Sequence, residues 1–233
     1  MSEIINNSRK RIDELKSLLK QLNEGRELSE IREQLTGLMG QIPYGDVVQA
    51  EQELIEEGMP ASEIQKYCDV HSEALKDKID LSFQKPVADG HPVSIMRKEN
   101  LAISDEVSKL TEILINLKLQ NDNPYYYRMS FEIRSILNNL MDIEKHYSKK
   151  ENLFFPYLEK YEITGPTSVM WGKDDEVREF LKSSLKVFSH NVEMTKELLL
   201  EYSEFLFKPT CDAIIEMIGK EEKILFPMCL DKF

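Results

Sequence analysis

The sequence predicts an all-α protein, and three observations lead to this fold class. Glycine is sparse, with 9 residues in a chain of 233. The Val-Ile-Thr alternation that half-buried strands show is almost absent. Long stretches instead repeat apolar residues every three or four positions, which is the pattern of helices that bury one face. The length suits one large domain or two small ones.

The first part of the chain predicts a small helical domain over residues 1–81. Apolar residues at helical spacing place its helices over residues 4–22, 28–39, 46–57 and 62–79. His71 stands alone in this part, and we expect it to be a surface or packing residue. Residues 82–90 contain a proline and a glycine and predict a linker.

Four longer helical patterns follow the linker and define a second domain over residues 91–233. They cover residues 92–119, 125–160, 174–202 and the stretch from there to about 227. Pro92 suits the first turn of a helix, Pro156 ends or kinks the second helix, and Pro209 begins or kinks the fourth. Four long amphipathic helices with modest connections predict an up-down four-helix bundle.

One phrase occurs twice, late in the second and the fourth of these helices. Lys150-Glu151-Asn152-Leu153-Phe154-Phe155-Pro156 recurs as Glu221-Glu222-Lys223-Ile224-Leu225-Phe226-Pro227. Both copies bring a carboxylate to the side of the helix that faces other helices. Because a buried carboxylate is costly unless it is paired or bound to a cation, the repeat suggests a symmetric site between helices.

Several polar side chains fall on the apolar faces of three helices. They are Glu99, His146, Glu151, and Glu222 or Glu221. His91 stands at the start of the first of these helices. Carboxylates and imidazoles that face one another in a bundle core hold non-haem metal ions, and they suit iron, manganese or zinc. Alternatively, the glutamates lie at the edges of the apolar faces and pair with Lys98, Lys150 or Lys220. His190, on the third helix, is either a further ligand or a packed or surface residue.

At these residues the chain resembles the hemerythrin-like, HHE cation-binding family. The stretches that carry the resemblance are His91-Pro92-Val93, Glu99-Asn100, His146-Tyr147, residues 150–160, residues 163–166 and 169–172, and residues 220–228. The resemblance extends from about Pro86 to the end. Residues 1–80, with Cys68-Asp69-Val70-His71, resemble a short helical domain of unknown function that precedes such a bundle in one subgroup.

The resemblance implies a bundle that binds non-haem iron, often two irons, with manganese or zinc left open. It further implies a role in oxygen, nitric oxide or redox sensing or in iron handling. His91 and His146 match histidines of the family, and Glu151 and Glu221 or Glu222 match its acidic positions. Four other residues stand where the family often has histidine: Ser94, Tyr161, Asp174 and Met217. These departures motivate a second hypothesis, a regulatory protein-interaction module with a lost or altered metal site.

Composition excludes several classes of function. A formal net charge of -12 argues against nucleic acid and anionic membranes as partners. The N-terminus lacks the features of a signal peptide, and the three cysteines form no metal-spaced cluster, so we expect a cytoplasmic protein with reduced thiols. Motifs for hydrolytic or nucleotide-dependent chemistry are absent, and a di-iron oxidase or repair enzyme is less supported than a binding protein. The partners left are a diatomic ligand and a protein that binds the N-terminal helices.

Overall fold

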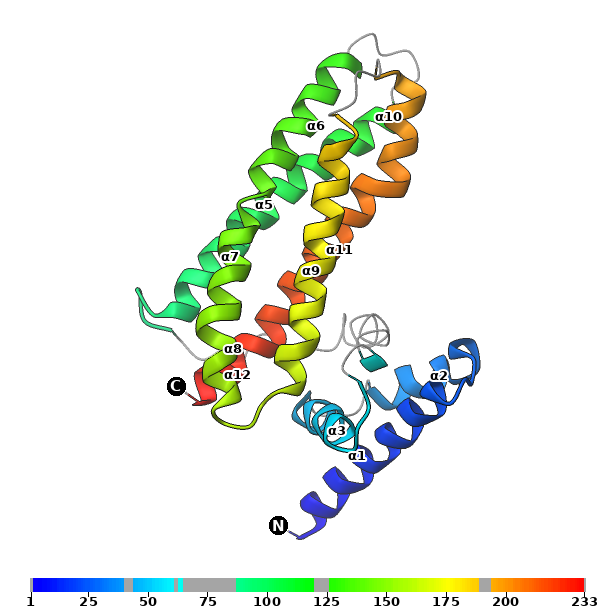
Figure 1. Ribbon diagram of the computed structural model, residues 1–233, viewed down its shortest axis with the longest axis vertical. Helices are drawn as coiled ribbons and strands as arrows, with labels where there is room; N and C mark the ends of the chain where they lie inside the picture. Colours follow the sequence, from blue (N-terminus) through cyan, green and yellow to red (C-terminus); the bar gives the residue numbers. More distant parts are fainter. Residues whose placement is uncertain are drawn as a thin grey trace. The chain divides into compact units, whose positions relative to one another are not determined.

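The computed structural model describes residues 2–39, 44–60, 63–64, 87–119, 126–188 and 194–232. The regular structure within these ranges is helical, and they contain no strand (Figure 1). The predicted all-α class is therefore confirmed. The predicted helix over residues 62–79 lies almost wholly outside the described residues. Residues 82–86 of the predicted linker, His71 and His190 lie outside them as well.

The chain divides into two compact units. The first unit consists of residues 1–85, 154–172 and 223–233, and the second consists of residues 86–153 and 173–222. This division follows contacts in space, whereas the predicted boundaries at residues 81 and 91 follow the sequence.

In its described residues, the first unit contains three N-terminal helices and three shorter segments from later in the chain. The helices are α1 (Ser2–Asn23), α2 (Leu28–Met39) and α3 (Tyr44–Glu56). The later segments are α8 (Phe155–Glu159), the first turns of α9 (Gly165–Lys186) and α12 (Phe226–Lys232). α1 packs against α2 and α3. Leu15, Leu19 and Leu54 are fully buried in this core, and Val169 of α9 belongs to the same cluster. Lys16 joins α1 to α3 through ion pairs with Glu53 and Glu57.

The second unit contains most of a four-helix bundle. Its elements are α5 (Pro92–Leu119), α6 (Tyr126–Leu140), α7 (Ile143–Lys149), most of η2 (Lys150–Phe154), α9 from Lys173 onward, α10 (Lys196–Tyr202), η3 (Ser203–Phe207), α11 (Lys208–Lys220) and the start of η4 (Glu221–Leu225). α5 packs against α6 and α11, as the up-down arrangement requires.

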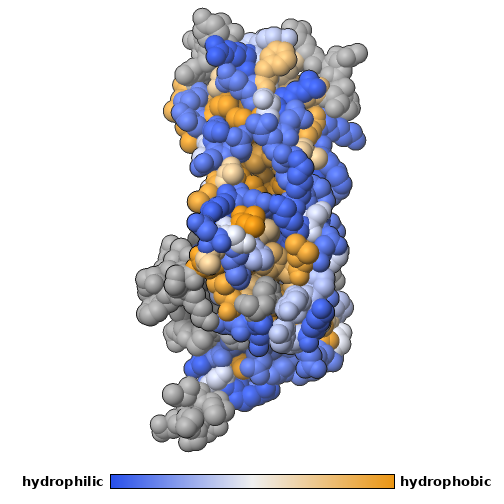
Figure 2. Space-filling view, turned by 90° about the vertical axis from the view of Figure 1, so that its left-hand side faces the viewer, coloured by the Kyte–Doolittle hydropathy of each residue, from blue (hydrophilic) through white to orange (hydrophobic). Residues whose placement is uncertain are grey.

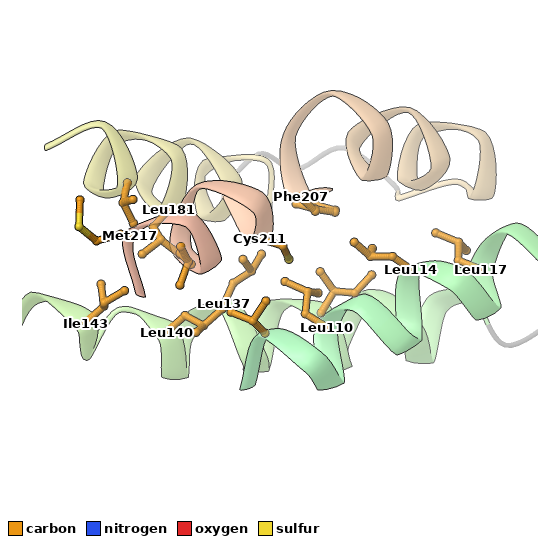
Figure 3. Close-up of a cluster of buried hydrophobic side chains, with 14 of the residues drawn as sticks. Leu110, Leu114, Leu117, Leu137, Leu140, Ile143, Leu181, Phe207, Cys211 and Met217 are labelled. Atoms are coloured by element: carbon orange, nitrogen blue, oxygen red, sulfur yellow. The ribbon is translucent and has the colours of Figure 1, made fainter. Parts of the chain in front are cut away.

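Apolar side chains from all four bundle segments meet along the axis of the second unit. In Figure 3, Leu110 of α5, Leu137 of α6, Leu181 of α9 and Met217 of α11 point into one shared interior. All four are almost completely buried. Fully burying a side chain of this size contributes roughly 1.5–3 kcal/mol, so this core supplies most of the stability of the bundle.

In the described part of the bundle, three π-helical turns interrupt the helices, and each lies just before a proline. η2 precedes Pro156, η3 precedes Pro209 and η4 precedes Pro227. A proline inside a helix has no N–H to donate, and its ring clashes with the carbonyl four residues earlier. A turn widened by one residue relieves this clash without ending the helix. The repeated phrase of the sequence therefore marks η2 and η4, where the helical phase changes.

Two predicted boundaries of the third helix were wrong. α9 begins at Gly165, although we expected the third helix to begin near residue 174. Pro166 lies in its first turn, where proline is well suited. α9 also ends at Lys186, and a new helix, α10, begins after Thr195, whose hydroxyl accepts a hydrogen bond from the Leu198 amide. Sequence reasoning had overlooked this residue as an N-cap.

The surface is predominantly polar on the face shown in Figure 2, where apolar residues form patches among hydrophilic ones. A search of the described residues found no helix with the length and apolar character that crossing a membrane requires.

Candidate polar site in the bundle

Charged side chains are buried in the second unit at the level where η2 and η4 begin. Lys150, Asp174 and Glu221 have no solvent exposure, and His146 and Glu151 are almost completely buried. An isolated charge at such depth costs several kcal/mol, so each group needs a partner within the protein or a bound ion. Hydrogen bonds and ion pairs to other side chains of the bundle supply these partners.

Lys150 lies at the centre of this group. Its Nζ donates a hydrogen bond to Asp174 Oδ1 at 2.7 Å and another to Glu221 Oε1. The same ammonium lies 4.3 Å from the centre of the Tyr147 ring, which is close enough for a cation–π interaction. Burial works against the charged ammonium, but the nearby acids outweigh it and raise the pKa of Lys150 above its ordinary value.

The pKa values of the two acids that contact Lys150 are shifted in opposite directions. Burial raises the pKa of Asp174 to about 8, and its Oδ2 has no hydrogen-bond partner among the described residues. Burial also disfavours the charged form of Glu221, but Lys150 and His146 prevail and lower its pKa to about 2. Lys150 therefore favours the charged form of Glu221 more strongly than that of Asp174, which is the more easily protonated of the two acids.

His146 lies between two glutamates that come from different helices. Its Nδ1 is 2.9 Å from Glu99 Oε2 on α5, and its Nε2 is 2.9 Å from Glu221 Oε2. Burial lowers the pKa of His146, but both glutamates favour the charged ring, and the pKa is raised overall. A doubly protonated ring donates to both carboxylates. The other oxygen of Glu99 accepts from Lys149.

The remaining carboxylates of the repeat are each held by an arginine. Arg178 on α9 makes a bidentate pair with Glu151, with N···O distances of 2.8 and 3.0 Å. Arg97 on α5 donates to Glu222 at 3.1 Å, and the Asn100 amide donates to the other oxygen of Glu222. Guanidinium groups match carboxylates in shape as well as in charge, so these pairs also orient the side chains.

The pairing follows the repeat in the sequence. Lys150 and Glu221 occupy the same position in the two copies of the phrase, as the first residues of η2 and η4. These two positions carry opposite charges, and their side chains bond to each other. The next position carries Glu151 in one copy and Glu222 in the other, and each of these glutamates pairs with an arginine. The symmetric site suggested by the sequence is therefore closed by ion pairs between the two copies and around them.

The predicted ligands lie at different depths and in different surroundings. Glu221 is fully buried and Glu222 is half-buried, which decides between the two inward candidates that the sequence had left open. The bonds described above do not include His91, whose Nδ1 accepts a hydrogen bond from the Val93 amide at the start of α5. Of the four residues that replace family histidines, Asp174 joins the charged group and Met217 lies in the apolar core.

The alternative of glutamates paired with lysines was partly correct. Lys150 does pair with Glu221, but Lys98 pairs with Asp89 and Lys220 pairs with Glu216. Sequence reasoning missed Arg178 and Arg97 altogether. A usable signal was present, because Arg178 lies four residues after Asp174 and so on the same side of α9.

Comparison with known protein families divides the chain into two parts. The model of the hemerythrin HHE cation binding domain matches residues 91–229. The model of a family of unknown function (DUF438) matches residues 15–81. No curated protein matches the chain. The first match covers more than half of the chain and supports a metal cofactor at the level of the family.

The donors of this chain, as they are arranged, do not fit such a metal centre. The two glutamates at His146 bind opposite nitrogens of the ring, so the three groups do not converge on one point. The ammonium of Lys150 lies where a second cation would have to approach Glu221, and two like charges repel. No group of three or more His, Cys, Asp or Glu placed to hold a metal is found in the described part of the chain.

Proposed function

Because the chain belongs to the hemerythrin HHE cation-binding family, we propose that it is a regulatory module in which internal ion pairs replace the metal centre. The bundle keeps the architecture of the family. Its charged core is neutralised by Lys150, Arg178 and Arg97, which are side chains of the protein itself. We further propose that the N-terminal helices, which match the family of unknown function, bind a protein partner.

The ammonium of Lys150 is the observation that carries this proposal. It is fully buried and is bonded to two acids from two other helices. A fixed ammonium at this point makes the binding of a divalent cation unfavourable, and it removes the electrostatic need for one. The replacement of family histidines by Ser94 and Met217 supports the same conclusion, because neither residue is a good ligand for iron.

The dependence of stability on metal tests the proposal. The full chain is purified without oxygen, and its melting temperature is compared after incubation with Fe(II), Mn(II) or Zn(II) and after treatment with a chelator. We expect the melting temperatures to agree. Binding at a concentration one hundred times the dissociation constant would add about 2.7 kcal/mol, and such a stabilisation would contradict the proposal.

His146→Ala and Glu151→Ala are informative only when metal-treated and chelated samples are compared. Both residues belong to the ion-pair group, so their loss destabilises the bundle whether or not a metal binds. The proposal predicts the same loss in both samples. A loss confined to the metal-treated sample would indicate that these residues are ligands.

A second candidate function is the binding of non-haem iron for oxygen, nitric oxide or redox sensing, or for iron handling. It is favoured by the family match and by His146, which lies within 2.9 Å of a carboxylate on each side. Its ligands would come from His91, Glu99, His146, Glu151, Glu221 and Glu222. Bound iron would supply open coordination positions for a diatomic ligand. Reconstitution with Fe(II) without oxygen, followed by absorption spectroscopy before and after adding nitric oxide, tests this candidate.

A further inference from the structure

A side chain of the N-terminal helices binds the start of α9. Gln52 of α3 accepts hydrogen bonds through Oε1 from the backbone amides of Thr164, at 3.1 Å, and Gly165, at 2.7 Å. Its Nε2 donates to Thr164 Oγ1 at 3.1 Å. The first amides of a helix have no partner within the helix, so Gln52 satisfies groups that otherwise need water or a local cap.

The same part of α9 is built into the core of the first unit. A Cβ atom on Gly165 would come within 3.2 Å of Gln52 Oε1 and 3.4 Å of the Gln52 Cα atom, so glycine permits the close approach of α3. One turn further on, Val169 is buried in the cluster that contains Leu15 and Leu54. The first turns of α9 therefore depend on the N-terminal helices for both polar and apolar contacts.

α9 continues without interruption to two members of the charged group in the second unit. Asp174 lies nine residues after Gly165, and Arg178 lies one turn beyond it. At about 1.5 Å per residue, Asp174 is about 14 Å along the helix from the residue that Gln52 binds. A helix transmits a displacement or a loss of order along its axis, because each turn is bonded to the next.

We propose that α9 is a coupling helix, through which the N-terminal helices control the ion pairs at Lys150 and Arg178. When Gln52 holds the first turn, α9 keeps Asp174 bonded to Lys150 and Arg178 bonded to Glu151. When a partner of the N-terminal helices withdraws Gln52, the first turn loses its cap and the ion pairs loosen. This coupling rests on the proposed function, in which the ion pairs of the bundle carry the regulatory signal, but the coupling itself needs no metal.

Hydrogen exchange measured by mass spectrometry on the full chain, with a chelator present, tests this coupling. Gln52→Ala removes the bonds to Thr164 and Gly165. Gln49→Ala is the matched control, since Gln49 lies on the same helix and bonds to Glu53. We expect Gln52→Ala to speed exchange about tenfold in residues 164–172 and measurably in residues 173–186, and Gln49→Ala to change neither segment.

The extent of the change decides the outcome. Faster exchange that stops at residue 172 would overturn the coupling, because the loss of the cap would then remain local. Gln52→Glu loses the donor bonds to Thr164 Oγ1 and Glu56 but keeps the acceptor oxygens and adds a charge that suits a helix N-terminus, so exchange should stay slow. If Gln52→Ala fails to fold, faster exchange over both segments in Gln52→Asn, whose side chain is too short to reach, supports the coupling. Metal binding by the chain would contradict the proposed function and leave this result unaffected.

Discussion

Replacing Lys150 with methionine removes the central cation of the bundle and keeps a side chain of similar length. Lys150 contributes two hydrogen bonds to acids and a cation–π contact, all without solvent exposure. Removing one partner of a buried ion pair costs about 3–5 kcal/mol, because the other charge stays behind. Burial favours the protonated form of Asp174, and Glu221 keeps its bond to His146, so we expect the lower value, about 3 kcal/mol.

Hydrogen exchange of the slowest amides in α7 and α11 measures this loss as the free energy of opening of the bundle. Lys145→Met is the control, because Lys145 is exposed and pairs with the exposed Asp142; it should change stability by less than about 0.5 kcal/mol. Combining Lys150→Met with Glu221→Gln removes both charges and should recover about 2 kcal/mol. A loss below about 1 kcal/mol in Lys150→Met, or no recovery in the double variant, would refute the assignment of Lys150 as the central cation.

Three further predictions concern the surroundings of Lys150 and the start of α9. The pKa of Glu221 is lowered to about 2, so Glu221 stabilises the fold above about pH 4.5, and this contribution is lost as the pH falls to about 2. The pKa of Asp174 is raised to about 8, so Asp174 lowers the stability of the fold as the pH rises from about 4 to about 8. In denaturation measurements, Asp174→Asn should therefore lose less stability than the wild type over this rise in pH. Arg178→Lys breaks the bidentate pair with Glu151 and should cost about 1–2 kcal/mol, measured by exchange in α9. Gly165→Ala should cost about 1 kcal/mol in thermal unfolding, although alanine normally favours a helix, because its Cβ meets the capping side chain of α3. An unchanged pH dependence in Asp174→Asn, or wild-type stability in Arg178→Lys or Gly165→Ala, would contradict the corresponding reasoning.

The sequence was sufficient to predict the fold class and most of the helices. α5 begins at Pro92 and ends at Leu119, as its apolar spacing and its proline indicated. The regular period of 3.6 residues carries this information wherever the helix is undisturbed. The same period failed beyond Lys149, because the π-turns before Pro156 and Pro227 add a residue and rotate the following side chains.

The candidate site was only partly predicted. Glu99, His146 and Glu151 were recognised as inward residues, but the choice between Glu221 and Glu222 stayed open. The burial of Lys150 was not foreseen, although Lys150 lies four residues after the buried His146. The arginines were missed as well. Helical spacing places Arg178 on the same side of α9 as Asp174, but its pair with Glu151 spans 27 residues of sequence, and spacing within one segment does not reveal the partner in another.

Titration of the metal-free chain with Fe(II) in the absence of oxygen, followed by calorimetry and by absorption, shows whether ion pairs replace a metal in this bundle. We expect no stoichiometric binding to the wild type, because Lys150 and the two arginines already neutralise the carboxylates. Stoichiometric iron that is lost in His146→Ala, while the apo form of that variant stays folded, would contradict the account and restore a metal centre to the bundle.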